Sequence, residues 1–436
     1  MGNSILKIIC LSLVIQIIAV SSGMANDFGK RDTLHTNSAE KMISEIIALE
    51  KDYVINKANG LLKKEPVTVT ASSCPRSAGG KHDYYSEGPY WWPDPENPDG
   101  PYIRKDGLKN PQLFSGHESA LQKMSWTIGT LTSAYLLTGE EKYVRAALPH
   151  LMAWFVDTAT MMNPNLLYAQ ALLGINSGRG AGVLDGAPLI DVARSIQILE
   201  RSKLVNPGDI EKFKYWFFNL LDWITTHPNG IHEMNAKNNH GSWWQAQVAA
   251  FASLVGDAKI LQLCREHYRN ILIPNQMAAN GSFPLELART RPFSYSLFNL
   301  DALSTLAIIV SDKDNDLWNF ELPDGRGMKK ALNFILPFVK NPQEWPYGKD
   351  ISLWENQPGP RPFMLYAAMA FRDNAWFEVW KAESAKQLKE KGNKSQSAQN
   401  RILWLGLEYP LPAKTAGNQT VAGELGIAIA ELKINR

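Results

Sequence analysis

Apolar side chains recur every three or four residues along most of the chain, which is the spacing of one face of an α-helix. One series runs from Leu121 to Tyr135, and a second runs from Tyr143 to Phe155 after a turn at Gly139. The turn makes the second helix the antiparallel partner of the first. Similar series predict helices over residues 39–62, 213–223, 244–251, 300–310, 328–339, 361–371 and 375–388.

The segment from Pro66 to Pro111 departs from this pattern, because prolines and glycines recur through it and prevent a regular helix. In a compact domain, a stretch of this length without helices is usually either functional or disordered. Two shorter loops, 163–188 and 229–240, are rich in glycine and asparagine and suit the rim of a cleft. The aromatic side chains of the long segment argue against disorder, and they are Tyr84, Tyr85, Tyr90, Trp91 and Trp92.

The predicted helices follow one another as hairpins, and no strand-like alternation of apolar and polar residues competes with them. The sequence also lacks the glycine-rich strand-to-helix motif of nucleotide-binding folds. We therefore expect an all-α protein, an (α/α) toroid of helical hairpins that is complete or incomplete as a barrel, with long loops over its cleft. Residues 26–436 are expected to form this single domain.

The first 25 residues have the composition of a secretory signal peptide. Lys7 provides the positive charge, residues 8–20 are mostly apolar, and small residues at 21–25 offer a cleavage point. Ser12 and Gln16 interrupt the apolar run, and no later segment approaches the ~20 apolar residues of a membrane span. We expect a periplasmic or secreted protein that is free of the membrane after signal cleavage.

The overall composition narrows the range of partners. Lys and Arg number 45 against 43 Asp and Glu, a formal charge of +2, which is too balanced for a protein that coats nucleic acid. An anionic partner must therefore bind to a local cluster of positive side chains. The 14 Trp and 14 Tyr fit either stacking platforms for sugar rings or a large buried core. Cys74 and Cys264 fit either a disulfide or two buried thiols, and the sequence leaves the oligomeric state open.

A first polar segment with candidate chemistry runs from Lys237 to Trp244. It places Asn238, Asn239 and His240 where an asparagine-rich loop enters a helix. Side chains of these types can simply cap the helix, and they can also donate hydrogen bonds to a ligand at its entry.

A second polar segment runs from Phe283 to Tyr295 and carries Arg289 and Arg291 shortly before the tyrosine. Two arginines and a tyrosine at this spacing can face one cleft. Arg291 and Glu286 could instead form an ordinary surface ion pair.

Together, the two segments resemble the alginate lyase superfamily of helical-toroid polysaccharide lyases. Its members carry an Asn-Asn-His motif, followed by a Pro-x-Glu-Leu segment that leads into an arginine and a tyrosine. The loop motifs Tyr-Trp-Trp-Pro-Asp-Pro at 90–95, Gly-Pro-Tyr-Ile at 100–103 and Asn-Pro-Asn-Leu-Leu-Tyr at 163–168 are also similar to that family. The resemblance extends from about Tyr84 to about Val310.

The resemblance implies a lyase that cleaves a 4-linked uronic acid polymer by β-elimination, with alginate as the expected substrate and glucuronan as the nearest alternative. Elimination removes the proton at C5, which is acidic only when the attached carboxylate is neutralised, and then expels the O4 leaving group. The resemblance assigns the neutralisation to Asn239, His240 and Arg289, and the proton transfers to Tyr295. The scheme needs no metal and no cofactor.

Tyr295 is expected to act as base and then as acid, because a phenol beside an arginine can have its pKa of ~10 lowered. On mannuronate or glucuronate chains the C5 proton and O4 lie on the same side, so one tyrosine can take and return the proton. On guluronate they lie on opposite faces, which requires a second base, and His240 is the natural candidate. Arg291 is the alternative to Arg289 as the catalytic arginine.

Other residues are expected to bind the polysaccharide, each with a structural alternative such as loop anchoring or helix-start packing. Metal catalysis is not expected, because His227 and His232 with Glu233 form no HExxH motif and lack support from cysteines. The expected substrate-binding residues are Tyr90, Trp91, Trp92, His117, Gln122, Lys123, Tyr168, Arg179, Asn238, Trp243 and Arg291.

Two other classes of function stay open. A glycoside hydrolase would need paired carboxylates, for which Asp185 with Glu286 or Glu355 could serve. A non-catalytic glycan-binding protein would keep the aromatic loop and would have no need of Tyr295.

Overall fold

The protein is described by a computed structural model over residues 41–390 and 401–405, and the expected signal peptide lies outside these residues. A helix over residues 41–61 comes first. The helices that follow are α2 (Gly116–Thr138), α3 (Lys142–Phe155), α4 (Leu189–Leu199), α5 (Pro207–Thr226), α6 (Pro228–Met234), α7 (Asn239–Val255), α8 (Ala258–His267), α9 (Ile273–Gln276), α10 (Pro284–Leu287), α11 (Pro292–Val310), α12 (Met328–Lys340), α13 (Pro362–Phe371) and α14 (Asn374–Glu390).

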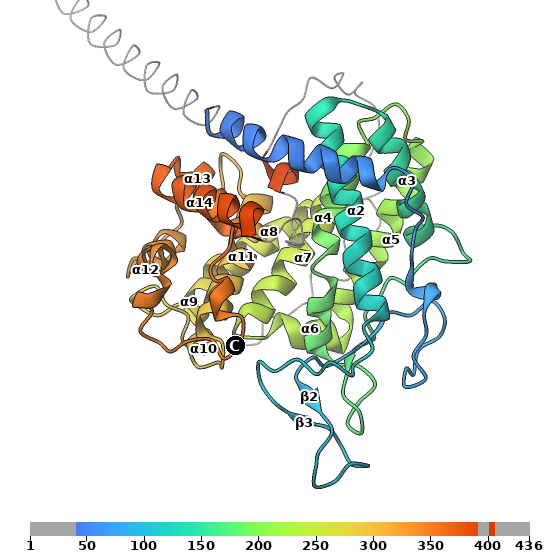
Figure 1. The fold of residues 1–436 in the computed structure, drawn as a ribbon, viewed down its shortest axis with the longest axis horizontal. Helices are drawn as coiled ribbons and strands as arrows, with labels where there is room; N and C mark the ends of the chain where they lie inside the picture. Colours follow the sequence, from blue (N-terminus) through green and yellow to red (C-terminus); the bar gives the residue numbers. More distant parts are fainter. Residues whose placement is uncertain (1–40, 391–400, 406–436) are drawn as a thin grey trace, which may run out of the picture.

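The helices are arranged around a central pair, α7 and α11, which pack against each other along their length (Figure 1). Helices α2, α3 and α5 lie on one side of this pair, and α12, α13 and α14 lie on the other. Neighbours in the chain pack as hairpins, as α2 does with α3 and α13 with α14. This is the all-α toroid of helical hairpins that the apolar pattern predicts.

Helix α7 shows how local sequence sets the ends of these elements. Its N-cap is Asn238, whose side chain accepts a hydrogen bond from the backbone nitrogen of His240 at 3.3 Å. It ends at Gly256, which adopts the left-handed conformation with φ of 81°. Between these ends almost every residue is buried, so α7 is a core helix whose first turn alone reaches the candidate site.

Helix α11 is the second core helix. It is long and apolar enough to cross a membrane by length and composition, but 78% of its most apolar stretch is buried inside the protein. Its buried aliphatic side chains include Leu297, Leu300 and Leu306. Packing inside the toroid therefore explains its apolar character.

The long segment between residues 66 and 111 contains short strands instead of helices. Strand β1 (Tyr85–Glu87) pairs in parallel with β4 (Tyr168–Ala171), and β2 (Trp91–Trp92) pairs antiparallel with β3 (Ile103–Arg104). The parallel pair joins the long segment to the 163–188 loop. Both loops are thus parts of one wall, which lies below α6 in Figure 1.

The sequence pattern missed several elements. Part of the expected 229–240 loop is helix α6, because Pro228 fits the first helical position and His227 Nδ1 accepts from the Asn229 backbone nitrogen at 3.1 Å. Helix α4 and the four short strands were also not predicted. Cys74 and Cys264 are free and buried, which corresponds to the two-thiol alternative.

Candidate active site

Asn239 occupies the first turn of α7 and is held by Glu286 of α10. Its backbone nitrogen donates to Glu286 Oε1 at 2.6 Å, and its Nδ2 lies 2.8 Å from both carboxylate oxygens. Both side chains are buried, at 1% and 0% exposure. Burial raises the pKa of Glu286, and the hydrogen bonds from Asn239 oppose that rise. Glu286 therefore fixes the orientation of the asparagine amide and does not form a surface pair with Arg291.

His240 follows Asn239 and is held by a second buried carboxylate, Glu233 of α6. His240 Nδ1 lies 2.5 Å from Glu233 Oε1, and Glu233 is 1% exposed. A carboxylate only accepts, so Nδ1 carries the proton of this bond. The pair thus leaves Nε2 free, and this nitrogen accepts a proton in the neutral ring and donates one in the charged ring.

Tyr295 lies in the first turn of α11, and Asp350 caps that turn. The Asp350 carboxylate accepts from the backbone nitrogens of Phe293 at 3.0 Å and Ser294 at 3.1 Å, and from the Ser294 hydroxyl. The Tyr295 hydroxyl donates to the hydroxyl of Tyr90 at 2.8 Å. The cap and the Tyr90 contact together fix the position of the phenol.

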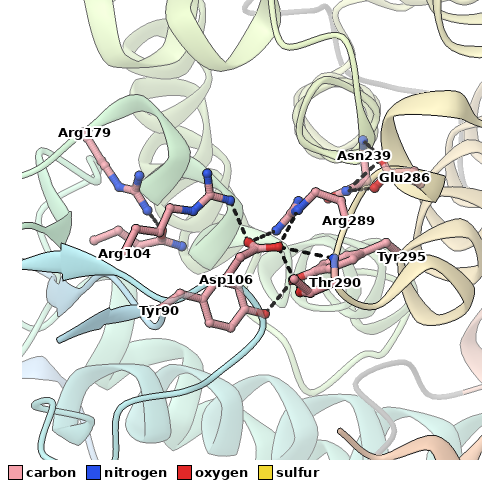
Figure 2. A network of polar contacts seen from close by, with 10 residues as sticks. Tyr90, Arg104, Asp106, Arg179, Asn239, Glu286, Arg289, Thr290 and Tyr295 are labelled. Atoms are coloured by element: carbon pink, nitrogen blue, oxygen red, sulfur yellow. Dashed lines mark hydrogen bonds and ion pairs between the residues drawn. The ribbon is translucent and has the colours of Figure 1, made fainter. Parts of the chain in front are cut away.

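Arg289 connects the α10–α11 segment to the loop after β3. Its Nη2 donates to Asp106 Oδ1 at 2.7 Å and its Nε to Oδ2 at 3.1 Å. Arg104 Nη2 reaches Oδ1 at 2.6 Å, and the Thr290 hydroxyl reaches Oδ2 at 2.9 Å. Figure 2 shows the two guanidinium groups approaching Asp106 from opposite sides. Burial alone would raise the pKa of Asp106, but these donors outweigh it and hold the pKa well below its usual range.

The guanidinium of Arg289 also covers the ring of Tyr295, with 4.1 Å between its central carbon and the ring centroid. The corresponding distance for Arg291 is 5.9 Å. Arg291 otherwise contacts Ser294 Oγ, at 3.4 Å. Of the two arginines, Arg289 is the one in close contact with the phenol.

The expectation that Tyr295 has a lowered pKa does not hold for this state of the protein. Burial raises its pKa well above 10, and the hydrogen bond to Tyr90 raises it further. Arg289 acts in the expected direction, but Asp106 offsets part of its charge. The phenol is therefore protonated in the arrangement described here.

The aromatic residues of the loop wall divide into two groups. Trp91 and Trp92 in β2 are partly exposed, and Trp92 Nε1 donates to the Leu108 carbonyl at 2.9 Å. Tyr168 packs with Tyr85 and Cys74 in a small apolar cluster inside the wall. Trp91 and Trp92 therefore keep partly exposed surface, whereas Tyr168 anchors the loop.

Arg179 is fixed within the loop wall beside these tryptophans. Its Nη2 donates to Gln170 Oε1 at 2.8 Å, and its guanidinium carbon is 6.0 Å from the Trp91 ring centroid. Burial lowers its pKa, and Glu233 acts in the opposite direction. Figure 2 places it next to Arg104, so it adds positive charge to the site.

Asp185 is linked to Arg179 through Gln170, which contacts both side chains. The Asp185 carboxylate accepts hydrogen bonds from Tyr84, Ser86 and Gln170. The carboxylates of Asp185 and Glu286 are thus both occupied by hydrogen bonds within the protein. Glu355 is exposed. The structure therefore offers no arrangement in which these carboxylates act as the acid and base of a hydrolase.

Other expected substrate ligands have structural roles or lie apart from the site. Both ring nitrogens of His117 are hydrogen-bonded, to the Tyr85 backbone nitrogen and the Ser72 carbonyl, at 3.0 Å each. Burial lowers the pKa of His117, so it packs the start of α2 as a neutral ring. Gln122 is exposed and bonds Glu118 within α2. The remaining residues of this kind are Lys123, exposed on α2, Asn238, which caps α7, and Trp243, buried against Phe298.

Sequence reasoning missed several residues that build the site, namely Arg104, Asp106, Glu233 as a histidine partner, Thr290 and Asp350. Glu233 was considered only as a metal ligand. Within residues 41–390 and 401–405, no group of three or more His, Cys, Asp or Glu side chains could hold a metal ion. His227 stacks on Trp223 with ring centroids 4.9 Å apart.

Asn239, Arg289 and Tyr295 lie close together in Figure 2, and His240 follows Asn239 in the first turn of α7. Side chains of these types are what a β-elimination on an acidic sugar requires. They supply donors for a carboxylate together with groups for proton transfer. With the helical toroid, this site defines the protein as a polysaccharide lyase. The alginate lyase family model matches residues 68–345, and the chain belongs to that family.

Two solved structures that are similar to the chain are alginate lyases, and the first of them supports this assignment. An alginate lyase from Bacteroides ovatus is 33% identical, with a TM-score of 0.74, over 86% of this chain and 97% of that one. Alginate lyase A1-III from Sphingomonas species A1 is 15% identical, with a TM-score of 0.45, over 72% of this chain and 85% of that one. None of the curated proteins matches the chain.

Proposed function

We propose that this enzyme is a secreted or periplasmic lyase that cleaves alginate by β-elimination and releases unsaturated uronates. The observation that carries the proposal is the stacking of Arg289 on Tyr295, with 4.1 Å between guanidinium and ring. Membership of the alginate lyase family and the similarity to the Bacteroides ovatus alginate lyase support alginate as the substrate. The apolar segment at residues 8–20 supports secretion.

In the proposed mechanism, Asn239, Arg289 and, in its charged form, His240 hold the carboxylate of the reacting uronate. Donors that strengthen as enolate charge develops lower the barrier to removal of the C5 proton. Tyr295 takes that proton on mannuronate and returns one to O4 as the glycosidic bond breaks. Because the phenol is protonated without substrate, Tyr295 can act as the base only after its bond to Tyr90 breaks and its proton passes to solvent water.

On guluronate chains, His240 is the proposed base. Its Nδ1 is bound to Glu233, which leaves Nε2 as the acceptor for the C5 proton. Tyr295 then acts as the acid on the opposite face. The Glu233–His240 pair thus supports activity on both uronates of alginate.

The test is to incubate the purified protein separately with polymannuronate, polyguluronate and glucuronan, and to follow the absorbance of the unsaturated product. We expect cleavage of polymannuronate and polyguluronate, with Tyr295→Phe as the matched inactive control. Cleavage of glucuronan alone would reassign the substrate. Saccharides released without a double bond would indicate hydrolysis and would contradict the proposal.

A further inference from the structure

The Asp106 carboxylate lies in a site built from donors of three residues. Oδ1 accepts from Arg289 Nη2 and Arg104 Nη2, and Oδ2 accepts from Arg289 Nε and the Thr290 hydroxyl. Arg289 thus binds both oxygens, in the side-on geometry that a guanidinium favours for carboxylates. No group in this site is specific for aspartate, so any carboxylate of the same geometry satisfies it.

Two guanidinium groups share the carboxylate of Asp106, and Arg179 lies next to Arg104 (Figure 2). Other carboxylates act on these arginines from farther away, Glu286 on Arg289 and Glu233 on Arg179. The Asp106 side chain is 20% exposed and that of Arg289 is 17% exposed, so both are reached from solvent. A carboxylate that arrives from solvent can therefore reach the same donors that hold Asp106.

The backbone is shaped to bring Asp106 to this position. Gly107 follows it with φ of 75°, and a Cβ there would lie 2.5 Å from Thr290 Oγ1. A side chain at position 107 would therefore keep the loop away from Thr290. The close approach of loop and site depends on that glycine.

We infer that Arg104, Arg289 and Thr290 form one carboxylate-binding site, that Asp106 occupies it in the absence of substrate, and that a uronate carboxylate of the polymer exchanges with Asp106. This inference rests on the proposed function and adds Arg104 and Thr290 to the substrate-binding residues. The exchange is inexpensive because each donor leaves one carboxylate and meets another. An empty site would instead leave a partly buried guanidinium without its anion.

The exchange predicts that Asp106 weakens binding. A substrate carboxylate can bind only the fraction of molecules in which Asp106 has left the site. Its apparent affinity is therefore the intrinsic affinity multiplied by that fraction. Asp106→Asn keeps the shape of the side chain but presents an NH₂ group to donors, so it leaves the site vacant more often. A structural role for Asp106 predicts the opposite, because loss of the contact would then misplace Arg289.

The experiment measures binding without turnover, by calorimetry in the Tyr295→Phe background, with tetramannuronate and with monomeric glucuronate as probes. We expect Asp106→Asn to bind both probes at least about fivefold more tightly. Asp99→Asn is the matched control, because Asp99 is exposed in the same loop and its substitution removes the same charge. It should change either affinity by less than about twofold, as expected for a screened surface charge.

Unchanged or weaker binding by Asp106→Asn, with an unaltered melting temperature, would overturn the exchange. Equal gains in Asp106→Asn and Asp99→Asn would also overturn it, since net charge would explain both. Thr290→Val added to Asp106→Asn gives a second measurement and should reverse part of the gain. Glucuronate binding measures the exchange even if the enzyme cleaves none of the three polymers. A failure of the exchange can therefore be distinguished from a failure of the proposed function.

Discussion

The guanidinium of Arg289 stacks on the ring of Tyr295 at 4.1 Å while two of its nitrogens remain bound to Asp106. One face of the arginine thus contacts the phenol, and one edge carries a carboxylate. Any movement of a carboxylate at that edge changes the field at the phenol directly. The contact therefore couples substrate charge to the proton affinity of Tyr295.

This geometry predicts which arginine is essential. Arg289→Lys should lower kcat/KM on polymannuronate by about 100-fold or more, since a lysine provides neither the planar stack nor the side-on carboxylate contact. Arg291→Lys should change kcat/KM by less than about fivefold, because its ring contact is longer, at 5.9 Å. Initial rates over a range of substrate concentrations check both values. A larger loss for Arg291→Lys would exchange the two roles.

Removal of the Tyr295 hydroxyl tests the proton transfers. Tyr295→Phe keeps the ring under Arg289, so the melting temperature should change little, while kcat should fall by about 100- to 10,000-fold. The loss should be similar on every polymer that the wild-type protein cleaves. Circular dichroism confirms folding, and a fully active variant would remove Tyr295 from the mechanism.

The histidine pair should matter more for guluronate than for mannuronate. His240→Ala removes a carboxylate donor on polymannuronate and the base itself on polyguluronate, so kcat should fall further on polyguluronate. Glu233→Gln should reproduce this difference in weaker form, about tenfold, because the ring loses its charged partner and keeps a hydrogen-bond acceptor. Rates on the two homopolymers measure the ratio. An equal loss on both polymers would leave His240 as a donor only.

Asp350 is expected to act through helix α11. Its carboxylate accepts two backbone hydrogen bonds in the turn that carries Tyr295, so Asp350→Ala should reduce the free energy of unfolding by about 1–2 kcal/mol. Activity should fall with it, since the phenol loses its fixed position. Asp350→Asn retains an acceptor and should recover part of both losses. Denaturant unfolding and initial rates provide the comparison.

Asp185 should make the stability depend on pH. Burial raises its pKa from 3.8 to about 6, so the folded protein binds this proton more tightly than the unfolded chain does. The resulting stabilisation is complete below pH ~4 and is lost as the pH rises through ~6. Relative to Asp185→Asn, the wild-type free energy of unfolding should fall by about 1–2 kcal/mol across this range, less than the full shift because the side chain keeps some solvent contact. Parallel curves for the two proteins would contradict the assignment.

The sequence predicted the helices better than their first turns. The apolar series indicated 244–251 and 300–310, whereas α7 begins at Asn239 and α11 at Pro292. The missing turns carry Asn239, His240 and Tyr295, whose polar side chains interrupt the apolar spacing. Their polar segments were noticed from the residue types, but their catalytic roles came only from the resemblance to a known family.

The sequence did not predict contacts between distant parts of the chain. Asp106 and Arg289 are 183 residues apart, and the approach of a proline-rich loop to a helix entry follows no periodic rule. Glu233 is only seven residues from His240, but it lies on a short helix that was taken for a loop. His117 shows the reverse case, a polar residue that burial and two backbone partners assign to packing.

The parallel pairing of β1 with β4 has a consequence for how such enzymes can be recombined. Tyr85 is in register with Tyr168, so two segments that are far apart in the sequence fold as one wall against the ends of α7 and α11. A chimera that replaces the 66–111 segment alone would pair a foreign strand with a resident one. Transplanting substrate preference between relatives therefore requires both segments to be exchanged together.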